Sequence, residues 1–116
     1  MVTKIVKDQI TRGELREMAK NQFGDLVKVV VDVRQEIMAI GGELHADEEV
    51  FLNEQVGSKR EDTWGINIYP QRHGDEMIEF DSMINLKPQY SNRSRGVESE
   101  KIKDKIIAIV KKLIIK

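Results

Sequence analysis

Apolar and polar residues alternate in two neighbouring segments, from Trp64 to Tyr69 and from Ile78 to Leu86. A period of two residues is typical of β-strands that bury one face. The segment 70–76 between them contains a proline and a glycine, as a loop would. We therefore predict an antiparallel strand pair, with Trp64 buried on its apolar face.

The segment from Asp25 to Ile40 fits two patterns. Apolar residues at every third or fourth position would form one face of a helix capped by Asp25, whereas the valines at 27, 29, 31 and 33 alternate as in a strand. Five valines in seven positions favour a pleated strand, because branching at Cβ restricts the side chain in a helix. We choose a hairpin that turns near Arg34 and Gln35, and the helix remains the alternative.

Three segments carry helix signals. The residues from Thr11 to Glu14 have the form of a capping box, and an apolar stripe follows them as far as Gly24. Residues 47–55 predict a short helix with Asp47 as its N-cap, although a strand over 50–52 is the alternative. A final helix is expected after Ser99, because apolar residues then recur at helical spacing.

Together these elements predict an α+β fold. Residues 3–7 alternate loosely and suggest an edge strand. We expect an antiparallel sheet of four or five strands packed against an N-terminal and a C-terminal helix, which cover one sheet face. With 116 residues, of which 40% are hydrophobic, we expect a single domain over residues 1–116 that folds without a metal or a disulfide.

The composition excludes several classes of protein. Cysteine is absent, so disulfides, thiolate nucleophiles and thiolate metal sites are excluded. No apolar run is long enough to cross a bilayer, and the N-terminus lacks the apolar region of a signal peptide. We therefore expect a cytoplasmic location and no membrane partner. A net charge of −1 and an aromatic content of 5% make nucleic acid an unfavourable partner.

Charge is distributed unevenly along the chain. Residues 43–62 hold seven acidic side chains against two basic ones, whereas residues 101–116 hold six lysines against one aspartate. We interpret both segments as solvated faces of one domain. A sheet edge or the final helix could also join copies of the chain in a homo-oligomer.

Several short segments together resemble a known family. They are Gly41-Gly42-Glu43-Leu44-His45-Ala46-Asp47, Trp64-Gly65-Ile66-Asn67-Ile68-Tyr69-Pro70, Ile84-Asn85-Leu86-Lys87-Pro88 and Asn92-Arg93-Ser94. In these residues the chain is similar to an uncharacterised bacterial domain family of unknown function. The resemblance extends over nearly the whole chain and implies no reaction, cofactor or ligand.

One cluster suggests a metal centre. If residues 43–47 are extended, Glu43, His45 and Asp47 point to one face, where an imidazole and two carboxylates could bind a divalent cation. Such a cation would activate a water molecule for hydrolysis. The spacing matches no zinc motif, and the simpler interpretation is that Asp47 caps a helix while His45 bonds a backbone carbonyl.

The polar side of the predicted strand pair gives a second candidate. This side carries Asn67, Glu79, Asp81 and Asn85. Paired carboxylates could perform acid–base chemistry if burial separates their pKa values, although a solvated sheet face has the same pattern. Tyr69 and Met83 also lie on this side and indicate that it is partly covered and lines a pocket.

A third candidate precedes the last helix. Its residues are Ser91, Asn92, Arg93, Ser94, Arg95 and Gly96. Two guanidinium groups, an amide, hydroxyl groups and a glycine before a helix N-terminus are able to bind a phosphate or a carboxylate. No Walker or dinucleotide motif is present, and a solvated loop paired with the acidic segment 43–62 is the simpler interpretation.

These candidates lead to three hypotheses about function. We favour a cytosolic binding domain for an anionic small molecule or a nucleotide-like ligand, held between the sheet and the loop 92–96. A metal-dependent hydrolase at the cluster 43–47 and an oligomer-forming subunit without a small-molecule site are the alternatives. The relative positions of His45, Asp81 and Arg93 discriminate between them, since a binding site requires that these side chains converge on one cleft.

Overall fold

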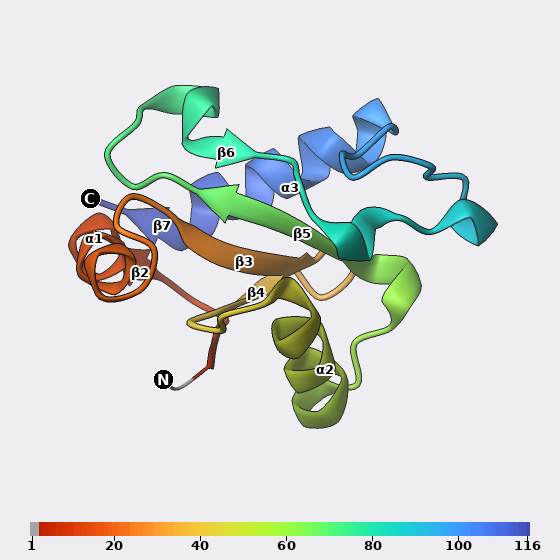
Figure 1. The fold of residues 1–116 in the computed structure, drawn as a ribbon, viewed down its shortest axis with the longest axis horizontal. Coiled ribbons are helices and arrows are strands. Elements are labelled where there is room, and N and C mark those ends of the chain that lie inside the picture. The colour runs from red at the N-terminus through yellow and green to blue at the C-terminus, as the bar shows by residue number, and fades with distance from the viewer. Residues whose placement is uncertain (1–2) are drawn as a thin grey trace.

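The computed structural model describes residues 3–116, and Figure 1 shows a central antiparallel sheet with strand order β1-β4-β3-β5-β6. Its strands are β1 (Lys4–Val6), β3 (Val27–Asp32), β4 (Ile37–Ile40), β5 (Thr63–Ile68) and β6 (Ile78–Glu79). The helices are α1 (Arg12–Asn21), α2 (His45–Val56) and α3 (Glu100–Leu113), and a short parallel pair joins β2 (Ile10–Thr11) to β7 (Ile114–Ile115). The predicted α+β class and antiparallel sheet are confirmed.

The valine-rich segment forms β3 and turns into β4, which confirms the hairpin and excludes the helical alternative. Val31 lies opposite Met38 in the register of the two strands. Asp32 holds the turn, because its Oδ1 accepts hydrogen bonds from the backbone nitrogens of Arg34 and Gln35. The turn therefore lies where the sequence predicts it.

One face of the sheet is an apolar core covered by α1 and α3. Trp64 is only 2% exposed there, as predicted, because it shares this face with Ile66 and Ile68. The strands also contribute Val6, Val27, Val29, Val31, Met38 and Ile40, and the two helices contribute Leu15, Ala19, Ile106, Ile109, Val110 and Leu113. Burial of these aliphatic and aromatic side chains is the main source of folding free energy on this face.

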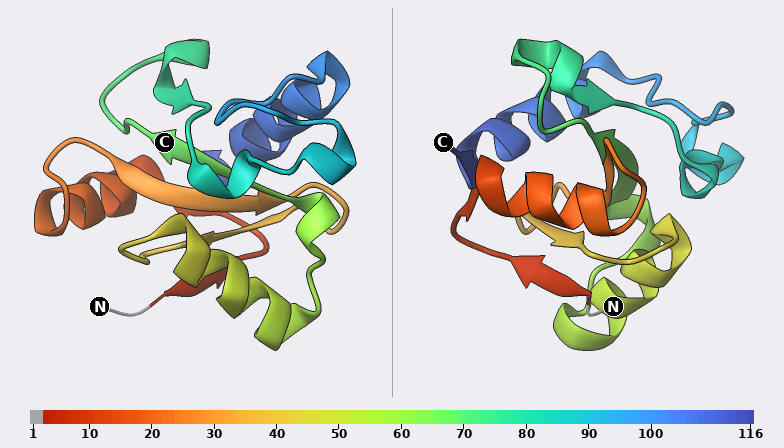
Figure 2. Two further views of the ribbon diagram at one scale, coloured as in Figure 1. Left: turned by 45° about the vertical axis from the view of Figure 1, so that its right-hand side comes forward. Right: turned by 60° about the vertical axis from the view of Figure 1, so that its left-hand side comes forward.

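The opposite face of the sheet is covered by α2 and by a 3₁₀ turn (Met83–Asn85), as Figure 2 shows for α2 and α3 on opposite sides. The apolar cluster on this face is small and consists of Val30, Ile37, Ala39, Leu52 and Ile84. The expectation of one helix-covered face thus holds for α1 and α3 but omits α2. Leu52 is the only apolar residue of α2 that is fully buried. The sequence of α2 therefore has no apolar stripe that would predict its packing on the sheet.

The second predicted strand ends early. β6 pairs with β5 at only two positions, Asn67 opposite Glu79 and Ile68 opposite Ile78. The prediction of a strand that continues to Leu86 was therefore wrong. The alternation does not follow burial either, because Asn85 on its polar side is fully buried, whereas Phe80 and Leu86 on its apolar side are only half-buried.

Side chains replace the missing strand along the edge of β5. Asn85 accepts a hydrogen bond from the Gly65 backbone nitrogen at 2.8 Å and donates one to the Gly65 carbonyl oxygen at 2.9 Å. The ammonium group of Lys87 donates to the carbonyl oxygen of Thr63. Because these edge groups are satisfied without a neighbouring backbone, residues 80–87 are able to form a separate layer over the sheet.

The N-termini of α1 and α3 follow the predicted signals, but that of α2 does not. Thr11 and Ser99 accept hydrogen bonds from the backbone nitrogens three residues ahead, at 3.1 and 3.3 Å, which confirms both as caps. The prediction of Asp47 as an N-cap was wrong, because α2 already begins at His45. Asp47 lies instead in the first turn, where a carboxylate is favoured by the helix dipole.

The longest helix within the described residues is α3, with 14 residues. A helix that crosses a bilayer needs about 20 apolar residues. No helix within residues 3–116 has the length and hydropathy required for a membrane span.

Candidate functional site

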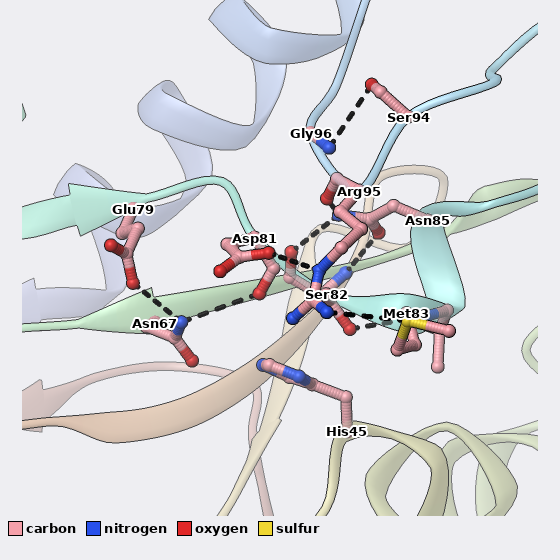
Figure 3. Close-up of polar contacts among 12 residues, drawn as sticks. His45, Asn67, Glu79, Asp81, Ser82, Met83, Asn85, Ser94, Arg95 and Gly96 are labelled. Carbon is pink, nitrogen blue, oxygen red and sulfur yellow. Dashed lines mark hydrogen bonds and ion pairs between the residues drawn. The ribbon is translucent and has the colours of Figure 1, made fainter.

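A cleft of about 240 Å³ opens on the α2 side of the sheet. It lies where the start of α2 approaches the segment that follows β6, and Figure 3 shows several of its side chains. The cleft is lined by Lys28, Leu44, His45, Ala46, Asn67, Asp81, Ser82, Met83, Ile84 and Arg95. It therefore gathers polar side chains from β3, β5, α2 and two later loops.

Gly65 allows these layers to approach the sheet closely. A Cβ atom at this position would lie 2.5 Å from the side chain of Ser82 and 3.1 Å from Cγ of His45. Any larger residue would therefore push both neighbours outward. The absence of a side chain at Gly65 therefore allows His45 and Ser82 to lie close to β5.

Two buried asparagines fix the loop that carries Arg95. Asn85 donates to the Arg95 carbonyl oxygen at 2.9 Å, in addition to its bonds with Gly65. Asn92 donates to the carbonyl oxygens of Asn85 and Gly96, both at 2.8 Å. The amides of Asn85 and Asn92 are thus occupied by backbone groups, and their role is to position the wall of the cleft.

His45 presents a defined tautomer to the cleft. Its Nε2 lies 2.7 Å from the carbonyl oxygen of Ile66, and because a carbonyl only accepts, Nε2 carries the proton. Burial lowers the pKa of His45 below 6.5, the hydrogen bond to Ile66 opposes this shift, and the nearby Lys28 and Arg95 add to it while Asp81 opposes it. The neutral ring therefore keeps a lone pair on Nδ1, for which the described residues provide no donor.

Asn67 has an unpartnered oxygen in the same cleft. Its nitrogen donates to a carboxylate oxygen of Glu79 at 2.8 Å, which fixes the orientation of the amide. Its Oδ1 is fully buried and has no hydrogen-bond partner within residues 3–116. In Figure 3 this oxygen points away from Glu79, toward the side of the cleft where the His45 ring lies.

The charged groups of the cleft are two cations and one anion. Arg95 Nε lies 2.6 Å from a carboxylate oxygen of Asp81, and Arg95 Nη1 lies 3.5 Å from the sulfur of Met83. Lys28 is half-buried and forms no ion pair with any residue in the range 3–116. Its ammonium lies 5.4 Å from the ring centre of Phe23. The cleft therefore carries a net positive charge when His45 is neutral.

The structure brings together part of each predicted site. His45, Asn67, Asp81 and Arg95 all line the cleft, although the sequence assigned them to three separate candidates. Arg93 is exposed and does not line it, so the convergence expected for Arg93 is found for Arg95 instead. Arg95 pairs with Asp81 and not with the acidic segment 43–62.

Two parts of the predicted anion loop lie elsewhere. Ser94 is exposed and its hydroxyl accepts a hydrogen bond from the Gly96 nitrogen at 3.3 Å. Ser99 caps the N-terminus of α3, and Asn92 accepts a hydrogen bond from the Glu98 nitrogen just before this helix, at 2.9 Å. Within the loop 92–96, Arg95 is the residue that lines the cleft.

The predicted metal cluster is divided between two places. Glu43 and Asp47 line a small depression together with Thr3, Gly41 and Gly42, whereas His45 lies in the cleft. Among residues 3–116, no three His, Asp or Glu side chains come close enough to hold a metal ion. The alternation that would align the three side chains stops at His45, because α2 begins there.

Lys28 and Leu44 are cleft residues that none of the candidates included. A signal for Lys28 was available, since it is a lone cation in a valine-rich strand and alternation places it on the same face as Asn67. Leu44 gives no such signal, because an apolar residue before a helix is unremarkable in sequence.

Residues 4–113 match the model of a family described as protein of unknown function (DUF5674). The match covers nearly the whole chain, so the chain belongs to this family, and the resemblance to an uncharacterised domain family is confirmed. No curated protein and no solved structure matches the chain. The family supplies no ligand or reaction, and the chemistry of the cleft is the remaining guide to function.

Proposed function

We propose that this member of the DUF5674 family binds a small anionic molecule in the cleft. The observation that supports the proposal is the convergence of Lys28 and Arg95 on a concave site whose single carboxylate is that of Asp81. An anionic group of a ligand would pair with these cations. Concave sites with a few convergent polar groups are the usual form of small-molecule sites.

Asp81 prepares Arg95 for such a ligand. The ion pair uses the Nε of the guanidinium group and so fixes the orientation of its plane. The terminal nitrogen Nη2 then remains for a ligand oxygen, because it forms no hydrogen bond within residues 3–116. Charge-assisted hydrogen bonds of this kind are the strong ones in anion recognition.

The size of the cleft favours a small ligand. Its volume of about 240 Å³ is below the range of about 300–1,000 Å³ that is usual for drug-sized ligands. A carboxylate or a phosphate ester of few atoms fits this volume better than a whole nucleotide. We therefore prefer the small anion to the nucleotide-like ligand. The proposal also includes a cytoplasmic location in a bacterial cell, which fractionation of the source cells would test.

The experiment is a thermal-shift series with phosphate, sulfate and acetate, with chloride at equal ionic strength as the reference for general salt effects. We expect at least one of the three anions to raise the melting temperature of the parent above the chloride value. Lys28→Gln and Arg95→Gln should reduce this rise, because each removes one cation from the cleft.

Arg93→Gln is the matched control. It removes an exposed arginine two residues from Arg95 in the same loop, and it should leave the shift unchanged. Equal shifts in the parent and in all three variants would contradict anion binding in the cleft. So would melting temperatures that never exceed the chloride reference.

A further inference from the structure

The cleft contains hydrogen-bond acceptors as well as cations. Asn67 is only 7% exposed, and its Oδ1 has no partner within the described residues. His45 is also 7% exposed and keeps a lone pair on Nδ1. A simple anion such as acetate brings further acceptors and has no donor for these two atoms.

A buried acceptor without a partner costs free energy that a suitable donor would recover. The Asn67 oxygen cannot be paired by rotation of its amide, because that would turn the nitrogen away from Glu79. The missing donor must therefore come from outside the described chain. A ligand that has both an anionic group and a hydrogen-bond donor would use the cations and the acceptors together.

The carboxylate of Asp81 indicates which kind of hydrogen-bond donor the ligand carries. Arg95 occupies one carboxylate oxygen of Asp81, and the second oxygen accepts no hydrogen bond within residues 3–116. A carboxylate beside two neutral acceptors favours a cationic donor over a hydroxyl group, because the bond is then charge-assisted. An ammonium group has three hydrogens, which matches the three acceptors of His45, Asn67 and Asp81.

The rim of the cleft is apolar. Leu44 is 57% exposed and Met83 is 61% exposed, and both line the cleft. Ala46 and Ile84 extend this apolar lining. Large apolar side chains that remain in water beside a polar cleft are suited to contact an apolar part of a ligand.

We propose that the ligand is a free α-amino acid with an apolar side chain. This inference rests on the binding of an anionic group proposed above and specifies the ligand as a zwitterion whose carboxylate is that group. The carboxylate of the amino acid contacts Lys28 and Arg95, and its ammonium group donates to Asn67 Oδ1 and to the acceptors of His45 and Asp81. The side chain of the amino acid packs against Leu44 and Met83.

Calorimetric titration with four compounds separates these contacts. L-leucine has all three groups, 4-methylpentanoate lacks the ammonium group, 3-methylbutylamine lacks the carboxylate, and glycine lacks the apolar side chain. We expect L-leucine to bind and each of the other three to bind at least roughly tenfold more weakly, since each loses a charge-assisted bond or an apolar contact.

Two variants locate the donor contact. Asn67→Ala removes the unpartnered oxygen, and we expect it to reduce the preference for L-leucine over 4-methylpentanoate, while His45 and Asp81 retain part of it. Tyr69→Phe is the matched control, because it removes another hydrogen bond to the same Glu79 oxygen, of 3.1 Å, without changing the cleft lining. It should keep the preference. The preference is the ratio of the affinities for L-leucine and 4-methylpentanoate. A general loss of protein stability would lower both affinities and leave this ratio unchanged.

Leu44→Ala tests the rim. The side chain is mostly exposed, so the fold should tolerate the change, and we expect weaker binding of L-leucine with unchanged binding of glycine.

The outcomes separate this inference from the proposed function. If 4-methylpentanoate binds as tightly as L-leucine, the amino-acid assignment is overturned and the anion-binding function stands. If L-leucine binds but Asn67→Ala keeps the preference, the assigned contact is overturned. If none of the four compounds binds, the amino-acid assignment also fails. The thermal shifts with simple anions then test anion binding in the cleft separately. The panel on the parent protein decides the ligand class even if a variant does not fold.

Discussion

The two faces of the sheet differ in what they bury. The face under α1 and α3 is lined by aliphatic residues and Trp64. The face under α2 has only a small apolar cluster and buries charged and polar side chains beside it. These are Asp32, His45, Glu48, Ser58, Thr63, Asn67, Ser82 and Asn85. The first face is a packed core, and the second is a layer of directed hydrogen bonds.

This difference explains where the cleft lies. An apolar core gains free energy from any close packing, whereas a buried polar layer is stable only if each group finds a partner. Asn85 meets this condition fully, with three hydrogen bonds to backbone groups. Asn67 meets it only in part, because its Oδ1 has no partner within residues 3–116. Glu48 Oε1 on this face also lacks a partner, but of the two only Asn67 lines the cleft, so its oxygen is the one suited to a ligand.

The largest effect is expected on the apolar face. Trp64→Ala should lower the free energy of unfolding by about 3–5 kcal/mol, because it removes a fully buried aromatic side chain. Urea denaturation followed by far-UV circular dichroism measures this change. Leu44→Ala, at a mostly exposed position, is the control and should stay within about 0.5 kcal/mol of the parent. A Trp64→Ala midpoint equal to that of the parent would refute the description of this face as the main core.

On the polar face we expect the next largest effect from Asn85→Ala. This change leaves the nitrogen and oxygen of Gly65 without their side-chain partner and removes one of two hydrogen bonds to the Arg95 carbonyl oxygen, so the cost should be about 2–4 kcal/mol. Asn53→Ala is the matched control, because Asn53 is exposed and makes one side-chain hydrogen bond, to the Ser58 oxygen. Equal costs for the two asparagines, measured by urea denaturation, would show that Asn85 does not replace a strand.

Glu48→Gln should change the free energy of unfolding by a smaller amount, and this change should depend on pH. Burial raises the pKa of Glu48 well above 4.5, although the hydrogen bond from the Gly42 nitrogen opposes the shift. The folded state then binds the proton more tightly than the unfolded state. Its contribution to stability is complete below the usual glutamate pKa and is lost as pH rises through the raised value. Relative to Glu48→Gln, the parent should therefore lose stability as pH rises.

The control for this measurement is Glu54→Gln, which changes an exposed glutamate of the same helix. Its stability should follow the parent at every pH. Parallel curves for the parent and Glu48→Gln would contradict a raised pKa of the buried Glu48 carboxyl group.

His45→Gln should have the smallest effect on the free energy of unfolding. The dependence of this effect on pH is opposite to that of Glu48→Gln. Because burial lowers the pKa of His45 below 6.5, the unfolded state binds the proton more tightly. Its contribution to stability is present above 6.5 and is lost as pH falls through the lowered value. Relative to His45→Gln, the parent should lose stability in acid. His73→Gln, in an exposed loop, is the control and should keep the acid slope of the parent.

Much of the architecture could be predicted from local sequence. Valine alternation specified the hairpin of β3 and β4, and Thr11 and Ser99 were recognised as caps from their positions before apolar stripes. The alternation from Trp64 to Ile68 specified which side chains of β5 face the core. These features depend on neighbours within a few residues, and the sequence contains that information directly.

The end of β6 could not be predicted in this way. The alternation from Ile78 to Leu86 is compatible with a strand, and the backbone leaves the sheet because Asn85 and Lys87 satisfy the edge of β5 in its place. Backbone groups of the next segment and the side chains of Asn85 and Lys87 compete for the same hydrogen-bonding groups at the edge of β5. This competition is decided only when the segments meet in the folded chain.

The sequence by itself determined the fold class, the apolar face of the sheet and the identity of most polar residues that line the cleft. His45, Asn67, Asp81 and Arg95 were all candidates, but in three unrelated groups. Only the tertiary structure united them, because β5 carries Asn67 while Gly65 allows the other segments to approach the same strand. Periodicity reports which face a residue occupies within its own element, and the meeting of distant elements is determined by packing across the sheet.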